Sequence, residues 1–184
     1  MATDKQDVQI MEDLYAENDR LSDGIRRDMN DRGIYVVNVL GAPGAGKTSC
    51  LIRLIAGLNG QTPYVIEGDI QSDIDTRKLS DLNIEAVQIN TNGACHLESV
   101  QIQAMLPKLS LRGPGVLFVE NIGNLVCPAE FNIGENVKLL ICTVTDGAAC
   151  RTVWTKSAPR NMVFGRLVQT RVRRVTQPET TITR

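Results

Sequence analysis

The chain has 184 residues, enough for one α/β domain with a sizeable core, and its formal net charge is −1. Its N-terminal stretch lacks the basic and apolar pattern of a signal peptide, and no run approaches the ~18 apolar residues of a membrane span. The five cysteines are odd in number, which favours free thiols in a reducing compartment over a disulfide framework. We therefore expect a cytoplasmic protein with no membrane partner.

The charge is unevenly distributed along the chain. Residues 1–150 carry 12 Lys and Arg against 20 Asp and Glu, whereas residues 151–184 carry eight against one. So sharp a change at one point indicates a boundary.

The first expected element is an amphipathic helix. Between Val8 and Met29, apolar residues recur near one face and are surrounded by charge. We expect this helix to occupy an N-terminal segment, residues 1–30. The apolar stripe is short and broken, so packing on the chain's own domain and packing against a second copy are equal alternatives.

A phosphate-binding motif follows the first expected strand. Residues 34–40 form an apolar, β-branched run, residues 41–48 match G-x-x-x-x-G-K-S/T, and residues 49–56 have helical character. In such a loop, backbone N–H groups surround phosphate oxygens, the lysine reaches the β- and γ-phosphates, and the hydroxyl binds Mg²⁺. The nucleotide-binding residues that the motif predicts are Gly41, Gly44, Ala45, Gly46, Lys47, Thr48 and Ser49.

Strands and helices alternate along the middle of the chain. The later strands are expected at residues 63–67, 86–89, 116–120 and 137–144, and the helices at 73–82 and 95–109. This order predicts an α/β fold, a P-loop NTPase whose mostly parallel sheet has helices on both faces. The domain is expected to span residues 31–147, with ligands at the carboxyl ends of its strands.

Acidic residues stand at two of these strand ends. Asp69 follows the second expected strand, and Glu120 closes the fourth. Together with Thr48, these carboxylates are predicted to bind Mg²⁺ or the waters around it. Lys47, Asp69 and Glu120 are therefore the predicted catalytic residues. Gly123, in the loop after Glu120, is predicted to contact the nucleotide.

A candidate metal site combines Cys95 and His96 with Cys127. His96 is the only histidine in the chain, and thiolate and imidazole groups suit Zn²⁺ or Ni²⁺. Three protein ligands leave a four-coordinate site open, either for an exchangeable metal or for completion across a dimer. From residue types alone, cysteines that merely fill the core are an equal alternative.

Four segments together resemble one family. They are residues 41–48, 67–70, 90–97 and 120–131, of which the last is long and specific. The resemblance is to HypB, the GTPase that assists nickel insertion during maturation of nickel–iron hydrogenase, and it runs from roughly residue 11 to Gly147. It implies binding of GTP or GDP with Mg²⁺, hydrolysis of GTP, and a nucleotide-linked homodimer.

The resemblance also implies what the candidate metal site binds and with whom the protein acts. Cys95, His96 and Cys127 match a Ni²⁺ or Zn²⁺ site at the dimer interface. The implied partners are a HypA-like nickel-delivery protein and the hydrogenase large subunit, with no nucleic acid. The related urease accessory GTPase UreG is the second choice. It has a Cys-Pro-His motif in place of the Cys-His pair found here, and it has nothing like residues 121–127 of this chain.

The end of the chain departs from the HypB pattern. Residues 148–184 contain no Asn-Lys-x-Asp motif, which reads guanine in this family. A frameshifted or rearranged end explains both this departure and the basic charge, and predicts a missing last strand and helix and an irregular tail. A genuine basic tail for an acidic partner or nucleic acid is the alternative. Two further alternatives are a metal- and nucleotide-binding remnant with little GTPase activity, and a P-loop kinase.

Overall fold

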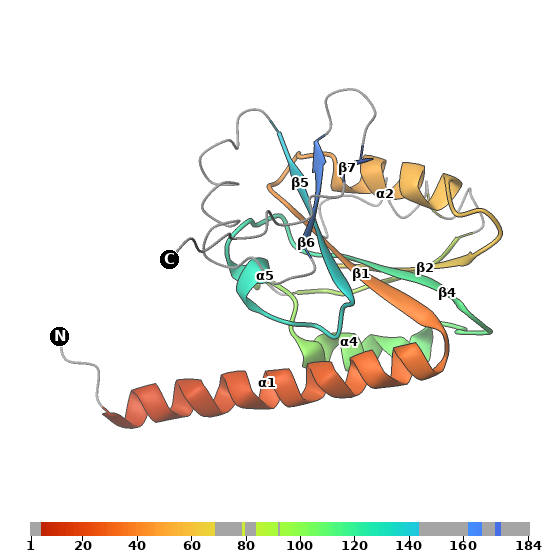
Figure 1. Ribbon diagram of the computed structural model, residues 1–184. Coiled ribbons are helices and arrows are strands. Elements are labelled where there is room, and N and C mark those ends of the chain that lie inside the picture. The colour runs from red at the N-terminus through yellow and green to blue at the C-terminus, as the bar shows by residue number, and fades with distance from the viewer. Residues whose placement is uncertain are drawn as a thin grey trace, which may run out of the picture.

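A central sheet organises the chain (Figure 1). The computed structural model describes residues 5–68, 79, 84–91, 93–143, 162–166 and 172–173. Its strands are β1 (Ile34–Gly41), β2 (Thr62–Glu67), β3 (Glu85–Gln88), β4 (Gly115–Glu120), β5 (Val137–Cys142), β6 (Met162–Arg166) and β7 (Val172–Arg173). They are arranged in the order β3-β2-β4-β1-β5-β6-β7, and all neighbours run parallel except β6 and β7. The predicted parallel α/β sheet is confirmed.

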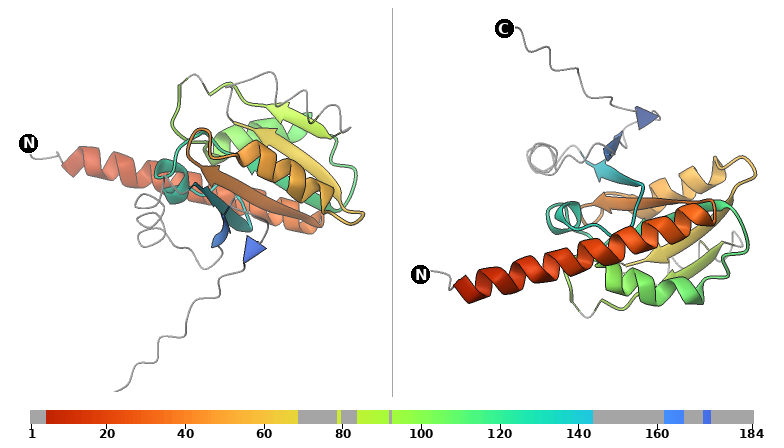
Figure 2. Two further views of the ribbon diagram at one scale, coloured as in Figure 1. Left: turned by 90° about the horizontal axis from the view of Figure 1, so that it is seen from above. Right: turned by 60° about the horizontal axis from the view of Figure 1, so that its bottom comes forward.

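Helices lie on both faces of this sheet (Figures 1 and 2). The helices are α1 (Lys5–Asp31), α2 (Lys47–Ala56), α4 (Ser99–Met105), α5 (Cys127–Glu130) and the short 3₁₀ helix η1 (Leu106–Lys108). α1 and α4 cover one face, and α2 covers the other. Among the residues that the structure describes, none of these helices combines the length and the apolar character needed to cross a bilayer.

The helix expected at residues 95–109 begins later than predicted. The side chain of Glu98 accepts a hydrogen bond from the backbone of Gln101, whose side chain in turn accepts one from the Glu98 backbone N–H at 2.8 Å. This reciprocal cap starts α4 at Ser99. Cys95 and His96 therefore lie in the loop before the helix. The helix expected at residues 73–82 falls outside the described residues, apart from Leu79.

Alternating side chains divide each strand between the two faces of the sheet. In β1, Val36 is buried in the cluster that includes residues of α1 and α4, whereas Val37 and Val39 are buried in the cluster that includes residues of α2. The apolar runs that predict strands are therefore explained by burial on both faces. The same division decides which face each polar side chain of a strand reaches.

The second half of α1 is packed under the sheet, and its first half is largely exposed apart from the stack of Tyr15 on Phe131. Ile25 and Met29 are buried, whereas Ile10 and Leu14 are 51% and 61% exposed. Figure 1 shows the first turns of the helix projecting beyond the sheet. Packing on the chain's own domain is confirmed for the second half. Contact with a second copy stays a prediction for the first half.

The C-terminal segment differs from its prediction where the structure describes it. β6 pairs in parallel with β5, and β7 pairs antiparallel with β6. An irregular tail is therefore wrong for residues 162–166 and 172–173. Without β6, the outer edge of β5 would leave backbone groups unpaired, and Val163 and Phe164 belong to residue types that favour extended structure. The remainder of residues 148–184 lies outside the described residues.

The cysteines also differ in part from their prediction. Cys50, Cys95 and Cys127 are free thiols, as expected. Cys142, at the end of β5, is disulfide-bonded. An odd cysteine count therefore does not exclude a disulfide in this chain.

The turn before β5 provides a stability test. Gly134 has a φ of +91°, and a Cβ atom added there would lie 2.5 Å from Cγ2 of Ile25 and 3.0 Å from the carbonyl oxygen of Ser22. Gly134→Ala should therefore lower the free energy of unfolding by about 1–3 kcal/mol, through backbone strain and overpacking against α1. Urea denaturation followed by circular dichroism measures this change.

Gly24→Ala is the matched control. Gly24 lies inside α1, and nothing lies within 4 Å of a Cβ atom added there. Because alanine favours helix, this variant should be about 0.5–1 kcal/mol more stable than the parent. Equal stability of the two variants would contradict the close packing of α1 on the turn at Gly134.

Candidate nucleotide and metal sites

The loop between β1 and α2 has the geometry of an anion site. Gly46 caps α2 with a φ of 85°, a left-handed conformation that glycine adopts without steric cost. The N-terminus of α2 therefore faces the loop, where its N–H groups favour phosphate. Lys47 is buried, and its ammonium lies 3.4 Å and 3.5 Å from the carbonyl oxygens of Gly41 and Ala42. The other predicted phosphate-loop residues surround the same turn, with Ala45 buried and Gly44 and Ser49 exposed.

A hydroxyl and two carboxylates meet at the strand ends beside this loop. The Thr48 hydroxyl donates a hydrogen bond of 2.9 Å to Oε1 of Glu120. Glu120 stands opposite Glu67 of β2 in the ladder, and the two residues are 5% and 4% exposed. Register partners point to the same face, so the two acidic side chains lie next to each other. Oxygen donors of these types are those that Mg²⁺ takes, and the predicted pair Thr48 and Glu120 therefore fits the ion.

The other predicted residues of this site have different outcomes. Asp69 lies outside the described residues, so its role in binding Mg²⁺ stays a prediction. Gly123 is half-buried in the loop after β4, and its contact with nucleotide also stays a prediction. Glu67 is the carboxylate that sequence reasoning missed. The period of two along β2 is the signal for it, because Val65 is buried on the α2 side and Glu67 shares that face.

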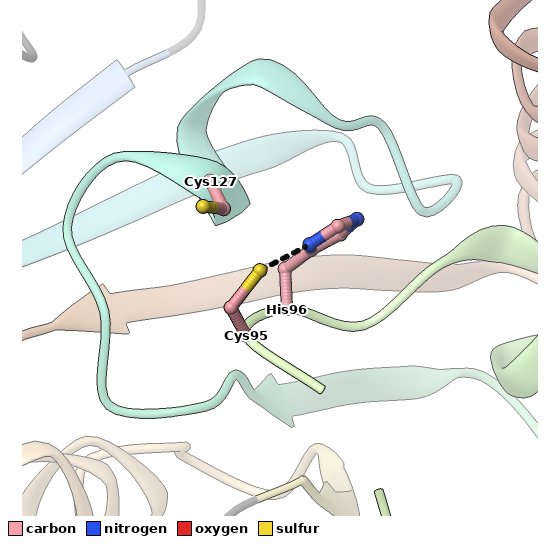
Figure 3. A group of neighbouring side chains, drawn as sticks. All are labelled: Cys95, His96 and Cys127. Carbon is pink, nitrogen blue, oxygen red and sulfur yellow. Dashed lines mark hydrogen bonds between the residues drawn. The ribbon is translucent and has the colours of Figure 1, made fainter. Parts of the chain in front are cut away.

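Cys95, His96 and Cys127 form a second cluster (Figure 3). Their ligand atoms all lie within 4.8 Å of one another, and Sγ of Cys95 is 3.2 Å from Nδ1 of His96. Cys95 and His96 come from the loop before α4, and Cys127 is the first residue of α5. The structure thus brings together the three predicted ligands. Cys95 is exposed and Cys127 is half-buried, which argues against cysteines that merely fill the core.

The surroundings of this cluster set the protonation of its side chains. Burial lowers the pKa of His96, so the imidazole is neutral near pH 7, which is the form that binds metals. A hydrogen bond with Cys127 raises the pKa of the Cys95 thiol. A metal ion that binds here must therefore displace a thiol proton. The donor set, two thiols and one imidazole, fits Ni²⁺ or Zn²⁺.

An aromatic stack supports the imidazole. The His96 ring lies on the Phe131 ring with centroids 3.9 Å apart and an interplanar angle of 26°. Phe131 in turn stacks on Tyr15 of α1 at 5.1 Å. Nε2 of His96 lies 3.5 Å from a carboxylate oxygen of Glu98. These contacts fix the plane of the ring.

Two asparagines after β4 contact the segment that carries Cys95 and His96, and one of them also contacts the phosphate loop. Asn121 is fully buried and accepts a hydrogen bond of 3.1 Å from the backbone N–H of Leu97, the residue after His96. The side chain of Asn124 donates to the carbonyl oxygen of Cys95 at 3.2 Å, and its backbone forms a β-bridge with Gly41. Sequence reasoning missed both asparagines as functional residues. Their only signal is the specific string at residues 120–131.

These features define a P-loop nucleotide-binding domain with a thiol and imidazole cluster beside its phosphate loop. The family described as "CobW/HypB/UreG, nucleotide-binding domain" matches residues 35–164. HypB from Archaeoglobus fulgidus has a crystal structure that superposes with a TM-score of 0.70 at 33% identity, covering 81% of this chain and 74% of that chain. The chain therefore belongs to the CobW/HypB/UreG family and, within it, to the HypB proteins.

Two further relatives agree with this assignment. The hydrogenase maturation factor HypB of Azotobacter vinelandii is 41% identical over 141 residues, which is 76% of this chain and 46% of that protein. The crystal structure of HypB from Helicobacter pylori in complex with nickel superposes with a TM-score of 0.66 at 25% identity, covering 82% of this chain and 86% of that chain. The chain spans about half the length of the first curated relatives it matches. The family match extends past Gly147 to residue 164, which lies in β6.

Removal of one thiol tests the metal cluster. Cys127→Ala should weaken binding of Ni²⁺ and of Zn²⁺ at least tenfold. Loss of a residue that only hydrogen-bonds a metal ligand already weakens metal binding about 10- to 100-fold, and this variant removes a ligand itself. Competition with a chromophoric chelator measures the affinity. Cys50→Ala is the control, since Cys50 is a buried free thiol on α2 and should keep the parent's metal affinity. Equal metal affinity in the parent and in Cys127→Ala would disprove the three-ligand site.

Proposed function

We propose that this chain is a GTP-binding and GTP-hydrolysing HypB, which acts as a nickel metallochaperone in the maturation of nickel–iron hydrogenase. The curated relatives carry the name hydrogenase maturation factor, and the Helicobacter pylori structure contains nickel. In this chain, the cluster of Cys95, His96 and Cys127 supports nickel as the cargo. The phosphate loop supports the nucleotide.

One observation carries the proposal: the loop after β4 contacts both sites. Asn124 bridges Gly41 at the phosphate loop and also holds the carbonyl of Cys95. Cys127 follows three residues later in the same loop. A movement of this loop on nucleotide exchange would displace Cys127 relative to Cys95 and change the metal geometry. Coupling of this kind is reciprocal, so the metal would also change the affinity for nucleotide.

Hydrolysis would depend mainly on positioning and electrostatics. In phosphoryl transfer from GTP, the protein does little covalent chemistry. The N–H groups of the loop and Lys47 would hold the phosphates, and Thr48 with Glu120 would hold Mg²⁺ and its waters. Glu67 and Asp69 are further candidates for orienting these waters. Mg²⁺, when bound, supplies charge neutralisation at the β- and γ-phosphates.

Three protein ligands suit a metal that must be handed on, because one coordination position stays open to exchange. We propose Ni²⁺ as the cargo, with Zn²⁺ able to occupy the same site. A second copy of the chain could complete the coordination, which supports a homodimer across the cluster. The exposed first half of α1, with Ile10 and Leu14, is a further surface for assembly. A HypA-like accessory protein and the hydrogenase large subunit are the proposed partners.

Coupling between the two sites tests this function. Ni²⁺ affinity should differ at least fivefold between the GDP-bound and the GTP-analogue-bound protein, at the lower end of typical coupling energies of about 1–3 kcal/mol. Lys47→Ala should remove this difference, because its loop can no longer neutralise the phosphates, and should leave nucleotide-free metal binding unchanged. The measurement is a calorimetric Ni²⁺ titration with each nucleotide.

Lys108→Ala is the matched control for Lys47→Ala. Lys108 is an exposed lysine of η1, so this variant should keep the parent's coupling. Nickel affinity that is the same in the parent with either nucleotide would rule out coupled delivery. Nickel binding without GTP hydrolysis would instead support the alternative of a metal- and nucleotide-binding remnant with little GTPase activity.

Base selectivity tests the missing guanine motif. Residues 148–184 lack Asn-Lys-x-Asp, so the site has no predicted carboxylate to pair with guanine's N–H donors. GTP and ATP should therefore compete within about tenfold, or about 1.4 kcal/mol. Displacement of a fluorescent nucleotide by each triphosphate measures the ratio. A several-hundredfold preference for GTP would show that another residue reads the base.

A further inference from the structure

A buried polar layer lies under the metal cluster, on the face of the sheet that α1 covers. Asn38 of β1 and Lys138 of β5 are register partners, so their side chains share this face. Asn121 donates a hydrogen bond of 3.2 Å to Asn38. Asn38 and Asn121 are fully buried, and Lys138 is 3% exposed. Apolar clusters lie on either side, so the layer interrupts an otherwise hydrophobic face.

Lys138 donates hydrogen bonds to the segment that carries Cys127. Its ammonium donates hydrogen bonds of 2.7 Å to the carbonyl of Ala129 and 2.9 Å to the carbonyl of Phe131. It also lies 3.4 Å from a carboxylate oxygen of Glu135. Ala129 belongs to α5, which Cys127 begins, and the Phe131 ring supports His96. One buried cation therefore holds the backbone of the segment that carries Cys127 and of the residue whose ring supports His96.

If position 138 served packing alone, a buried lysine would be an unfavourable choice. Burying an ammonium removes its hydration, and burial lowers the pKa of Lys138 against the opposing effect of Glu135. Leu140, two residues along the same strand, packs with Ala129 without such a cost. An apolar residue at position 138 would extend that cluster, since buried ion pairs are often replaceable by hydrophobic groups at no loss of stability. The lysine does something that an apolar residue cannot do, because only a donor can fix two carbonyl groups.

We propose that Lys138 is a positioning residue for the metal site. Its ammonium holds residues 127–131 at the separation from Cys95 and His96 that one metal ion can span. This inference rests on the proposed function, because it assigns a support to the same metal cluster. It adds a residue on a core strand, outside the two segments that carry the ligands.

Replacing the ammonium by a thioether of similar length tests the inference. Lys138→Met should weaken Ni²⁺ binding 10- to 100-fold, the range found when an outer-sphere partner of a metal ligand is lost. The charge-transfer bands between thiolate and Ni²⁺ should shift. The affinity for GDP in the absence of metal should stay within about twofold of the parent, because the hydrogen bonds of Lys138 go to Ala129 and Phe131 and not to the phosphate loop. Lys108→Met is the matched control at an exposed lysine and should leave all three readouts unchanged.

A second variant separates positioning from stability. Removing Lys138 alone leaves the buried carboxylate of Glu135 uncompensated, which is destabilising by itself. The double variant Glu135→Gln with Lys138→Met removes that charge, while Gln can still accept the hydrogen bond that Glu135 receives from the Ile133 N–H. A positioning role predicts that the double variant regains the part of the urea stability lost through the uncompensated charge but keeps the weak Ni²⁺ binding, because the carbonyls of Ala129 and Phe131 still lack their donor. Recovery of both together would overturn the inference.

A metal-free readout distinguishes failure of this inference from failure of the proposed function. A monosubstituted trivalent arsenical captures two thiols only when they lie close together, and among the free thiols of the described residues Cys95 and Cys127 form such a pair. The parent should be captured rapidly, and Lys138→Met at least tenfold more slowly. If the parent binds the arsenical but not Ni²⁺, the nickel function fails while the positioning role stands. Equal capture and equal Ni²⁺ affinity in parent and variant would overturn the positioning role.

Discussion

The backbone at the carboxyl end of β4 is fixed from both sides, and both sites depend on it. The carbonyl of Glu120 accepts a hydrogen bond from the N–H of Gly68 beyond β2, and the N–H of Asn121 donates to Val39 of β1. Successive side chains of an extended chain point to opposite faces. Glu120 therefore reaches Thr48 on the α2 side, and Asn121 reaches Leu97 on the α1 side. Two adjacent residues thus place a phosphate site and a metal site across one sheet.

This geometry explains how a small fold can connect two ligands without a separate domain. Parallel strands end at the same edge, so the loops after β1 and β4 lie near each other and near the end of β2. The loop after β4 then crosses to Gly41 through the bridge at Asn124 and continues into α5. Under the proposed coupling, a displacement at the phosphate loop would reach Cys127 through a few bonded residues. Packed side chains and hydrogen-bond networks of this kind can carry coupling when they have two discrete arrangements.

The elements that were predictable from sequence are those set by local pattern. The phosphate loop and strands β1 to β5 follow from a contiguous motif and from apolar runs. The metal cluster was predictable through family resemblance, because Cys95 lies before α4 and Cys127 begins α5, and only the tertiary fold brings these two segments together. Pairing of residues 162–166 with β5 was missed, since it depends on an open sheet edge and not on a strong local pattern.

The polar residues of the layer under the metal cluster show a different limit. Asn38 and Lys138 stand in strands whose other residues are mostly apolar, and a sequence pattern cannot tell whether such a residue faces solvent or a buried partner. Only the folded structure makes this distinction, because it shows that the carbonyls of Ala129 and Phe131 accept hydrogen bonds from the ammonium. A fully apolar face would pack α5 without fixing its rotation, because hydrophobic contact is not directional. Directional hydrogen bonds at that position fix the orientation of α5, and with it the orientation of Cys127 toward its two fellow ligands.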